Sequence, residues 1–318
     1  MTLTPSAVWQ QLCPTAPSWP ALIEPWPLLH ACSNDVVNTG ADSLQRLAPA
    51  SESMDCLRLD RLDHQVSGNK SLKLLGHIDA WQKSSHTRLL SFGGRWSNHL
   101  HALAYAAARL DIPAIGVVQG YPEQPLTPTL MDCQAQGMQL ILVDKMTYRQ
   151  RYQLAYRQAL STEHDAWVIP EGGDGPEGGV GFHPLRALLR EYDEVWIAAG
   201  TGMSAQALAR QLSAEQRLVV VNAVADNGVL AARMQALTDS ADTQCAIRVI
   251  DDAHFGGFGH CPAALKALIQ DYDQRSLPLD PVYTAKLAWA LERAAQQDEL
   301  QGRVLVVHTG GLQGRRSL

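Results

Sequence analysis

Short apolar runs alternate with stretches of helical periodicity along most of this chain. Runs such as residues 114–118, 194–198 and 218–224 are apolar apart from Glu194 and Asn222 and do not alternate with polar residues. Strands that are apolar on both faces are typical of a parallel sheet covered by helices on both sides. The pattern therefore predicts an α/β protein with mainly parallel open sheets covered by helices.

The same periodicities predict the positions of the individual elements. Strands are expected at residues 56–63, 88–92, 114–118, 139–143, 166–169, 194–198, 218–224 and 303–307. Helices are expected at residues 70–83, 98–110, 129–136, 147–160 and 206–212. Residues 1–50 are only weakly periodic and are expected to cover an edge of the core.

Composition excludes several classes of protein. Of the 318 residues, 46% are hydrophobic and 18% charged, which is enough to bury a sizeable core. Lys and Arg number 26 against 32 Asp and Glu, so no basic surface for nucleic acid or an anionic membrane is expected. No apolar run approaches the ~18 residues that a membrane span needs. Arg46 is the first basic residue, which argues against a signal or transit peptide.

The cysteines and histidines give no metal signature. The six cysteines lie far apart without a C-x-x-C pair, as expected for reduced thiols in a cytoplasmic protein. His99 and His101 are two residues apart on a predicted helix and cannot share a face. We therefore expect no metal site. The sequence also lacks a Walker phosphate loop and a G-x-S-x-G nucleophile turn.

Glycines cluster where the predicted strands end. The clusters are Gly93–Gly94, Gly172–Gly175, Gly178–Gly181, Gly200–Gly202, Gly256–Gly259 and Gly310–Gly311. Any one of them is explained by a turn. Open parallel sheets, however, bind ligands outside the carboxyl ends of their strands. Together the clusters favour a ligand site.

One of these loops is a candidate phosphate cradle. Residues 198–205 read Ala-Ala-Gly-Thr-Gly-Met-Ser-Ala and pass from a strand into a helix. Free backbone N–H groups and hydroxyls at such a turn bind phosphate. The cradle would consist of Gly200, Thr201, Gly202, Met203 and Ser204. The segment also fits the dinucleotide pattern G-x-G-x-x-A, but the next strand ends in Asn222 and not in an acid, which favours a small phosphorylated cofactor over NAD.

A lysine supplies the second part of a cofactor site. Lys70 lies in Gly68-Asn69-Lys70-Ser71, at the junction of a loop and a predicted helix. Burial and a helix N-terminus both lower the pKa of an amine, and an unprotonated amine forms a Schiff base with an aldehyde. Most lysines are solvated surface residues. A lysine together with a separate phosphate cradle nevertheless favours pyridoxal phosphate.

Four segments resemble, in the same order, motifs of the family that contains 1-aminocyclopropane-1-carboxylate (ACC) deaminase and D-cysteine desulfhydrase. They are Ser67–Leu74 (G-G-N-K-x-x-K-L), Ser91–His99 (S-x-G-G-x-x-S-N-Q/H), Asp280–Lys286 (D-P-V-Y-[TE]-x-K) and His308–Gly311 (H-[TL]-G-G). The resemblance implies the two-domain fold type II of pyridoxal phosphate enzymes, similar to tryptophan synthase β. The large domain would comprise residues 1–72 and 171–318, and the small inserted domain residues 73–170.

The resemblance also implies roles for single residues. Lys70 would hold the cofactor covalently and then move the substrate's α-proton. Asn69 would bond the cofactor's phenolic oxygen. Tyr283 would lie near the cofactor or the leaving group, although a core tyrosine is the alternative.

Substrate contacts follow from the same resemblance. Ser97, Asn98 and His99 would bind the substrate carboxylate at a helix N-terminus. Ser97 could equally be an N-cap, and both roles can hold together. Phe258 lies in a glycine loop where relatives often have a tyrosine beside the substrate, so that hydroxyl would be missing here.

Thr284 departs from the ACC deaminase pattern. ACC deaminase has a glutamate there, against the pyridine nitrogen of the cofactor, and a carboxylate keeps that nitrogen protonated. Threonine is no acid. This favours reactions in which a β-substituent leaves with the electrons, such as loss of sulfide from cysteine, over opening of a cyclopropane ring.

The predicted activity is a deaminating α,β-elimination on a small amino acid, similar to that of D-cysteine desulfhydrase, which releases a 2-oxo acid and ammonia. The alternatives are ACC deamination, β-replacement or racemisation on the same scaffold, and a non-catalytic protein that binds pyridoxal phosphate. The resemblance also implies a homodimer. Residues 314–318 are expected to form a solvated tail.

Overall fold

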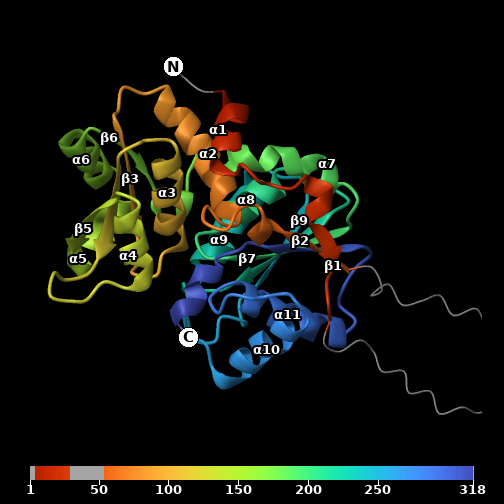
Figure 1. Cartoon of the computed structure of the whole chain (residues 1–318). Coiled ribbons are helices and arrows are strands. Elements are labelled where there is room, and N and C mark those ends of the chain that lie inside the picture. Colours follow the sequence, from red (N-terminus) through yellow and green to blue (C-terminus); the bar gives the residue numbers. More distant parts are fainter. Residues whose placement is uncertain (1–3, 29–53, 318) are drawn as a thin grey trace, which may run out of the picture.

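The computed structural model describes residues 4–28 and 54–317 of the chain. Two separate sheets organise these residues, a six-stranded and a four-stranded one. In Figure 1 the smaller sheet lies on one side of the molecule with helices α4, α5 and α6, and the larger sheet lies on the other side with α10 and α11. The predicted α/β class is confirmed.

The larger sheet has the strand order β1-β2-β10-β7-β8-β9. Its strands are β1 (Ile23–Pro25), β2 (Met54–Arg58), β7 (Glu194–Ala199), β8 (Arg217–Asn222), β9 (Ala246–Ile250) and β10 (Val304–His308). Only β1 runs antiparallel, against β2. Successive side chains of β7 point to opposite faces of the sheet, so Val195 packs in the core on one face and Trp196 in the core on the other.

The smaller sheet is parallel throughout, in the order β5-β4-β3-β6. Its strands are β3 (Arg88–Gly93), β4 (Ala114–Gln119), β5 (Gln139–Val143) and β6 (Ala166–Ile169). Apolar cores cover both faces of this sheet as well. The expectation of mainly parallel strands with two covered faces holds for both sheets.

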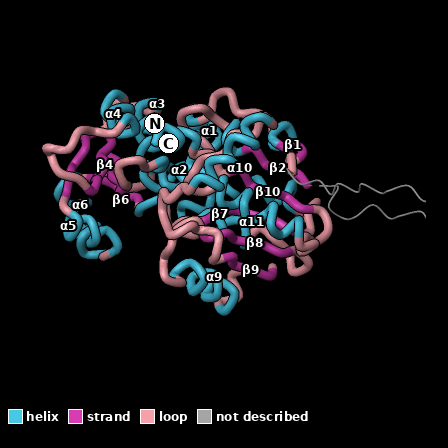
Figure 2. The backbone as a smooth tube through the Cα atoms, turned by 90° about the horizontal axis from the view of Figure 1, so that it is seen from below, coloured by secondary structure: helices cyan, strands magenta, loops and turns pink. Residues whose placement is uncertain are grey.

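Helices surround the two groups of strands (Figure 2). The α-helices are α1 (Pro5–Leu12), α2 (Asn69–Gln82), α3 (Asn98–Arg109), α4 (Pro128–Ala135), α5 (Lys145–Arg149), α6 (Leu154–His164), α7 (Arg186–Leu189), α8 (Met203–Ala209), α9 (Val229–Asp239), α10 (Ala263–Gln274) and α11 (Thr284–Gln296). The short 3-10 helices are η1 (Trp19–Leu22), η3 (Leu59–Arg61), η4 (Gln150–Tyr152), η5 (Glu171–Gly173), η6 (Pro176–Leu185) and η7 (Leu312–Ser317).

Helix α2 connects the two sheets. It begins after the loop that follows β2 of the large sheet and leads to β3 of the small sheet. The four small-sheet strands lie within residues 73–170, and α2 runs without a break across the predicted boundary between residues 72 and 73. The domain boundaries themselves stay a prediction.

Three of the segments that differ from the sequence-based expectation follow. The strand predicted for residues 56–63 ends at Arg58, because Asp60 turns back to bind the guanidinium of Arg58 and the chain continues as η3. The helix predicted for residues 147–160 is interrupted at Gln153, whose backbone is extended.

The third difference is the C-terminal segment, which is not a free tail. Residues 312–317 form η7. Arg315 binds Asp273 of α10, and Arg316 donates to Asp132 of α4 over 2.7 Å. The segment therefore connects the two halves of the molecule.

Some glycines serve packing and not a ligand. A Cβ at Gly76 of α2 would lie 2.0 Å from the Glu177 carbonyl oxygen, and one at Gly181 would lie 2.1 Å from that of Leu72. Side chains at either position would push α2 and η6 apart. The glycine cluster 178–181, grouped above with the ligand loops, thus belongs at least partly to helix packing.

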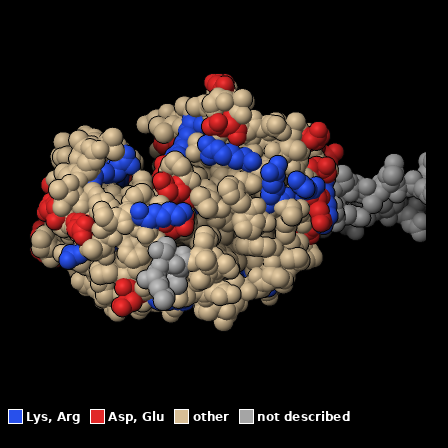
Figure 3. All heavy atoms as spheres, turned by 90° about the horizontal axis from the view of Figure 1, so that it is seen from above, with Lys and Arg blue, Asp and Glu red and all other residues tan. Residues whose placement is uncertain are grey.

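The surface carries mixed charges. Figure 3 shows Lys and Arg side chains interspersed with Asp and Glu over one face. Among the described residues, no helix is both long and apolar enough to cross a membrane.

Candidate active site

Lys70 lies at the start of α2, as the sequence predicts. The chain enters the helix through Gly68, whose φ of +67° is a left-handed value that favours glycine. A Cβ at this position would lie 2.0 Å from the Thr309 carbonyl oxygen, and the same carbonyl accepts a hydrogen bond from the Asn69 N–H. The loop after β10 therefore sets where α2 begins and where Lys70 is placed.

The Lys70 amine is poised to lose its proton. Burial lowers its pKa from 10.5 to about 8, against the opposing attraction of Asp280. Its Nζ donates to Asn69 Oδ1 over 2.8 Å. A lysine that is partly unprotonated near neutral pH can act as a nucleophile toward an aldehyde and as a base toward a proton.

The predicted phosphate loop lies beside this lysine. It follows β7 and opens α8, and Gly202 has a φ of +85°. The Asn69 side-chain amide donates to Ser204 Oγ over 2.8 Å. Residues 135 positions apart in the sequence are thus in contact, and the amine and the cradle form one site.

Met203 can contribute only its backbone N–H to the cradle. Its side chain is buried in the core, with its Cε 3.5 Å from where a Cβ of Gly179 would be. Thr201 has its methyl group 3.3 Å from the Cβ position of Gly172. The loops 172–173 and 200–204 are therefore adjacent.

Lys73 is a site residue to which the sequence analysis gave no role. It is buried, and its Nζ donates to the Gly172 carbonyl oxygen over 2.9 Å. Burial lowers its pKa well below the ordinary value, and the nearby Lys70 lowers it further. Its position one turn after Lys70 on a predicted helix was the signal that could have identified it. It places a second amine beside the turn that touches Thr201.

Glu171 was also missed, because no local pattern reveals it. Its carboxylate accepts hydrogen bonds from Tyr148, Arg151 and Tyr152, which come from α5 and η4. Glu171 begins the turn that contains Gly172. It therefore fixes the glycine turn to the small-sheet half of the molecule.

Tyr283 lies against the phosphate loop. A Cβ at Gly200 would be 3.1 Å from the Tyr283 hydroxyl. Burial raises the pKa of this phenol, with Asp280 and Glu171 adding to the rise, so it stays protonated. Its ring meets that of Phe258 edge-on, with 6.4 Å between centroids, and Phe258 is 63% exposed. Tyr283 thus lies between Gly200 and Phe258, and Phe258 is the solvent-exposed member of the three.

Thr284 is bound to Asp280. Its hydroxyl donates to Asp280 Oδ2 over 2.7 Å and accepts from the Asp280 N–H over 2.7 Å. The carboxylate also accepts from the backbone N–H groups at the start of α11. With its single proton directed to Asp280, the Thr284 hydroxyl does not act as a donor toward a ring nitrogen in this arrangement.

Ser97 and Asn98 begin α3. Ser97 Oγ accepts from the Leu100 N–H over 3.2 Å, so its expected N-cap role is confirmed. Asn98 packs against the glycine turn after β10, where a Cβ at Gly311 would lie 2.4 Å from its Nδ2. Its Oδ1 is buried and has no hydrogen-bond partner among the described residues. The amide is thus open to a further polar group.

His99 is a neutral acceptor. Ser91 Oγ donates its one proton to the Ile169 carbonyl over 2.8 Å, so His99 Nε2, also 2.8 Å from Ser91 Oγ, must be the protonated nitrogen. Burial lowers the pKa of His99 well below its ordinary value, as do the charges of Lys70 and Lys73. Nδ1 is left as a buried lone pair with no described partner. Recognition of a carboxylate therefore falls to Ser97, Asn98 and the helix N-terminus.

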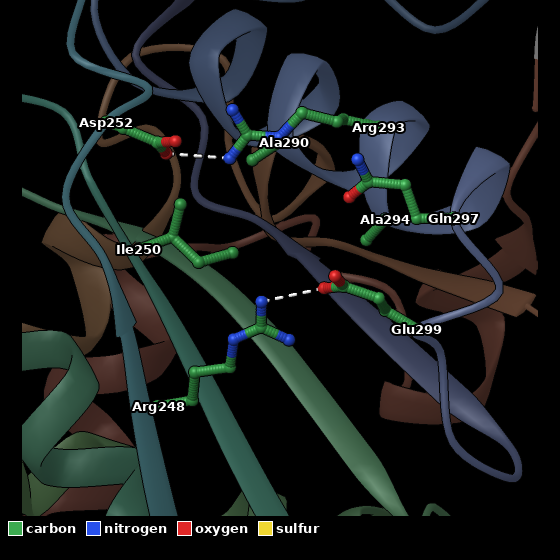
Figure 4. A pocket seen from close by; sticks show the side chains of 8 residues that line it. All are labelled: Arg248, Ile250, Asp252, Ala290, Arg293, Ala294, Gln297 and Glu299. Carbon is green, nitrogen blue, oxygen red and sulfur yellow. Dashed lines mark hydrogen bonds and ion pairs between the residues drawn. The ribbon is translucent and has the colours of Figure 1, made fainter.

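A separate cavity of about 310 Å³ lies between β9 and α11 (Figure 4). In it Arg248 pairs with Glu299 and Arg293 pairs with Asp252, each over 2.7 Å. None of the predicted site residues lines this cavity. It takes no part in the site around Lys70. No group of three or more His, Cys, Asp or Glu side chains suited to a metal ion occurs among the residues described.

The residues around Lys70 fit pyridoxal phosphate. They comprise a partly buried amine with a lowered pKa, an adjacent amide, a glycine turn with two hydroxyls, and a protonated phenol against that turn. The unpartnered Asn98 Oδ1 and His99 Nδ1 show that the buried polar groups are not satisfied within the described chain alone.

Comparisons with known proteins agree with this arrangement. The chain is 28% identical over 271 residues to "Putative 1-aminocyclopropane-1-carboxylate deaminase" of Pyrococcus horikoshii, covering 78% of this chain and 81% of the relative. It is 28% identical over 283 residues to D-cysteine desulfhydrase of Klebsiella pneumoniae, covering 77% and 83%. No family model matches the chain.

Solved structures share the fold. A crystal structure of an ACC deaminase homologue superposes with a TM-score of 0.72 at 24% identity, covering 83% of this chain and 86% of the other. Maize serine racemase superposes with a TM-score of 0.57 at 12% identity, covering 82% and 84%. The chain is therefore similar in sequence to proteins named ACC deaminase and D-cysteine desulfhydrase, and it has the fold of the type II pyridoxal phosphate enzymes.

Proposed function

We propose that this chain is a pyridoxal phosphate enzyme that eliminates the β-substituent and the amino group of a small amino acid, as a D-cysteine desulfhydrase does. The observation that carries the proposal is the contact between Asn69 and Ser204, which places the Lys70 amine directly beside the 200–204 loop. The relatives named ACC deaminase and D-cysteine desulfhydrase support the same class of reaction.

The cofactor would be held at two ends. Lys70 supplies the amine to which its aldehyde attaches, and the backbone N–H groups of residues 200–204 with the Thr201 and Ser204 hydroxyls bind its phosphate. Lys73, beside the Gly172 turn, adds a nearby amine. When bound, pyridoxal phosphate supplies an electron sink for the bonds at the substrate's Cα.

Substrate binding is assigned to the start of α3. The free N–H groups of a helix N-terminus favour a carboxylate, and the Asn98 side chain at the first position of α3 has an Nδ2 that can donate to one. His99 Nδ1 is a buried acceptor without a described partner, so it does not itself bind the carboxylate. The carboxylate end of the amino acid would therefore be fixed, with its Cα directed toward Lys70.

Lys70 and Tyr283 are assigned to the two bonds that break in the substrate. Lys70, with a pKa near 8, takes the proton from the substrate's Cα once its amine is free. Tyr283 remains protonated because burial raises its pKa, so its hydroxyl can donate a hydrogen bond to the departing β-substituent. For D-cysteine the balance is cysteine plus water to pyruvate, hydrogen sulfide and ammonia.

Thr284 favours elimination over ring opening. Because its hydroxyl is bonded to Asp280, it offers no acid to the cofactor's ring nitrogen. A weaker electron sink suits a substrate whose electrons leave promptly with a β-substituent. ACC deamination is the second candidate, and the ACC deaminase homologue with a TM-score of 0.72 keeps it open.

The test is a substrate screen with purified protein loaded with pyridoxal phosphate. We expect pyruvate and sulfide from D-cysteine, whereas an ACC deaminase would release 2-oxobutanoate from ACC. Borohydride should fix the cofactor on the peptide that contains Lys70, and Lys70→Ala should abolish both the label and the activity. A label on another lysine would contradict the proposal. A protein that binds the cofactor but converts no amino acid of either hand would show a non-catalytic relative.

The proposed activity also predicts the partners of this chain. We expect a small amino acid as the substrate, a homodimer, and a cytoplasmic enzyme without a nucleic-acid or membrane partner. Sedimentation equilibrium of the purified protein tests the dimer, and a monomer mass at micromolar concentration would contradict it.

A further inference from the structure

Lys286 is a fully buried lysine outside the machinery assigned above. Its Nζ donates to the Ala223 carbonyl over 2.7 Å and to the Gly257 carbonyl over 2.7 Å, and its exposed fraction is 0%. Burying an amine is costly unless hydrogen bonds compensate it. The two short bonds compensate part of this cost.

The two carbonyls belong to different segments of the chain. Ala223 directly follows β8, and Gly257 lies in the glycine loop of residues 254–259. Lys286 itself lies in the first turn of α11, three residues after Tyr283. One side chain thus ties the start of α11 to two loops at the same end of the large sheet.

The glycine loop has few other restraints. Gly256, Gly257 and Gly259 all have positive φ, and side chains at Gly256 and Gly259 would meet nothing within 4 Å. Such glycines keep many conformations open when the chain is not held. Apart from bonds within the loop, Phe255 packs edge-on against Trp289 of α11, with 5.2 Å between centroids.

The loop carries Phe258, whose ring contacts Tyr283, and Tyr283 contacts Gly200 of the phosphate loop. We propose that Lys286 is a positioning residue, which holds the 254–259 loop so that Phe258 and Tyr283 border the substrate side of the site. The substrate part of this inference rests on the proposed function.

The charge state of Lys286 does not alter this role. Burial lowers its pKa to about 8, against the attraction of Asp280. A neutral amine still has two N–H donors, which is the number that the Ala223 and Gly257 carbonyls require.

Hydrogen exchange of the full-length protein, measured by mass spectrometry without substrate, tests the restraint directly. Lys286→Met keeps most of the side-chain volume and removes the donors. We expect amides of residues 254–259 to exchange at least about tenfold faster in this variant, with α11 and β8 unchanged. Lys266→Met, on an exposed position of α10, is the matched control and should exchange as the unaltered protein does.

A kinetic measurement tests the consequence for the proposed reaction. In the loaded enzyme we expect Lys286→Met to raise KM about tenfold and to change kcat about threefold or less, because positioning of Phe258 affects binding more than proton transfer. The exchange measurement needs no cofactor. A failure of the proposed function would therefore leave the restraint on the loop testable, and the two outcomes are distinguishable.

Loop amides that exchange at the original rate in folded Lys286→Met would overturn the proposal. Should that variant not fold, Lys286→Gln retains an amide that can donate to one carbonyl and should give an intermediate exchange rate. If neither variant folds, Lys286 is a requirement of the fold and not a positioning residue, and the proposal is wrong.

Discussion

Asn69 contacts both parts of the candidate site, because its Oδ1 accepts from Lys70 Nζ while its Nδ2 donates to Ser204 Oγ, each over 2.8 Å. Asn69→Asp would add a negative charge between an amine and an anion cradle. We expect the affinity for pyridoxal phosphate to fall by about tenfold or more, and that for phosphate-free pyridoxal to fall less. Titration of absorbance with the two compounds measures both affinities.

Ser204→Ala is the uncharged comparison. It removes the partner of the Asn69 amide and one proposed phosphate donor without adding a charge, so the binding free energy of pyridoxal phosphate should weaken by about 1 kcal/mol for each hydrogen bond lost. Equal losses for the two compounds in both variants would show that the 200–204 loop does not bind the phosphate.

The pKa of Lys70 predicts how its reactivity depends on pH. Because burial lowers the pKa from 10.5 to about 8, the unprotonated and reactive fraction should rise through pH 8. Reductive methylation of Lys70, followed by peptide mass spectrometry from pH 6 to 11, measures this directly. Half-maximal reactivity near pH 8 is the expected result. A midpoint near the ordinary value of 10.5 would show that Lys70 is solvated.

The sequence was sufficient for most of the parallel strands but not for all of them. Gln139–Val143 was predicted with its observed bounds, because a short apolar run between polar turns has few alternatives. Strand β9 was not predicted. It lies at the edge of the large sheet and contains Arg248, so its sequence lacks a continuous apolar run.

The candidate site likewise has parts that the sequence predicted and parts that it did not. Lys70 and the 200–204 loop were located by local chemistry and by the family resemblance. Glu171 acts through tertiary contacts, which no spacing in the sequence reveals. Asp280 binds Thr284 only four residues further on, but the sequence does not show that the Thr284 hydroxyl is directed to this carboxylate, so the role of Thr284 changes.

Gly68 and Gly94 make a matched pair for testing the start of α2. Gly68 combines a φ of +67° with a Thr309 oxygen 2.0 Å from its Cβ position, whereas a Cβ at Gly94 meets nothing within 4 Å. Gly68→Ala should lower the free energy of unfolding by more than about 2 kcal/mol, and Gly94→Ala should stay within about 0.5 kcal/mol. Urea unfolding measures both. Similar values for the two variants would mean that the close approach to Thr309 is absent.

Thr284 tests whether the bond to Asp280 is structural. Thr284→Val keeps the shape but leaves a buried carboxylate oxygen and the Asp280 N–H without the hydroxyl, at a cost of about 1–3 kcal/mol in the free energy of unfolding. Thr284→Ser keeps the hydroxyl and should lose less than about 1 kcal/mol. Urea unfolding at neutral pH separates the two. If valine and serine are equally tolerated, the hydroxyl is not committed to Asp280. It would then be free to meet the cofactor's ring, and the structural reason for preferring elimination over ring opening would fail.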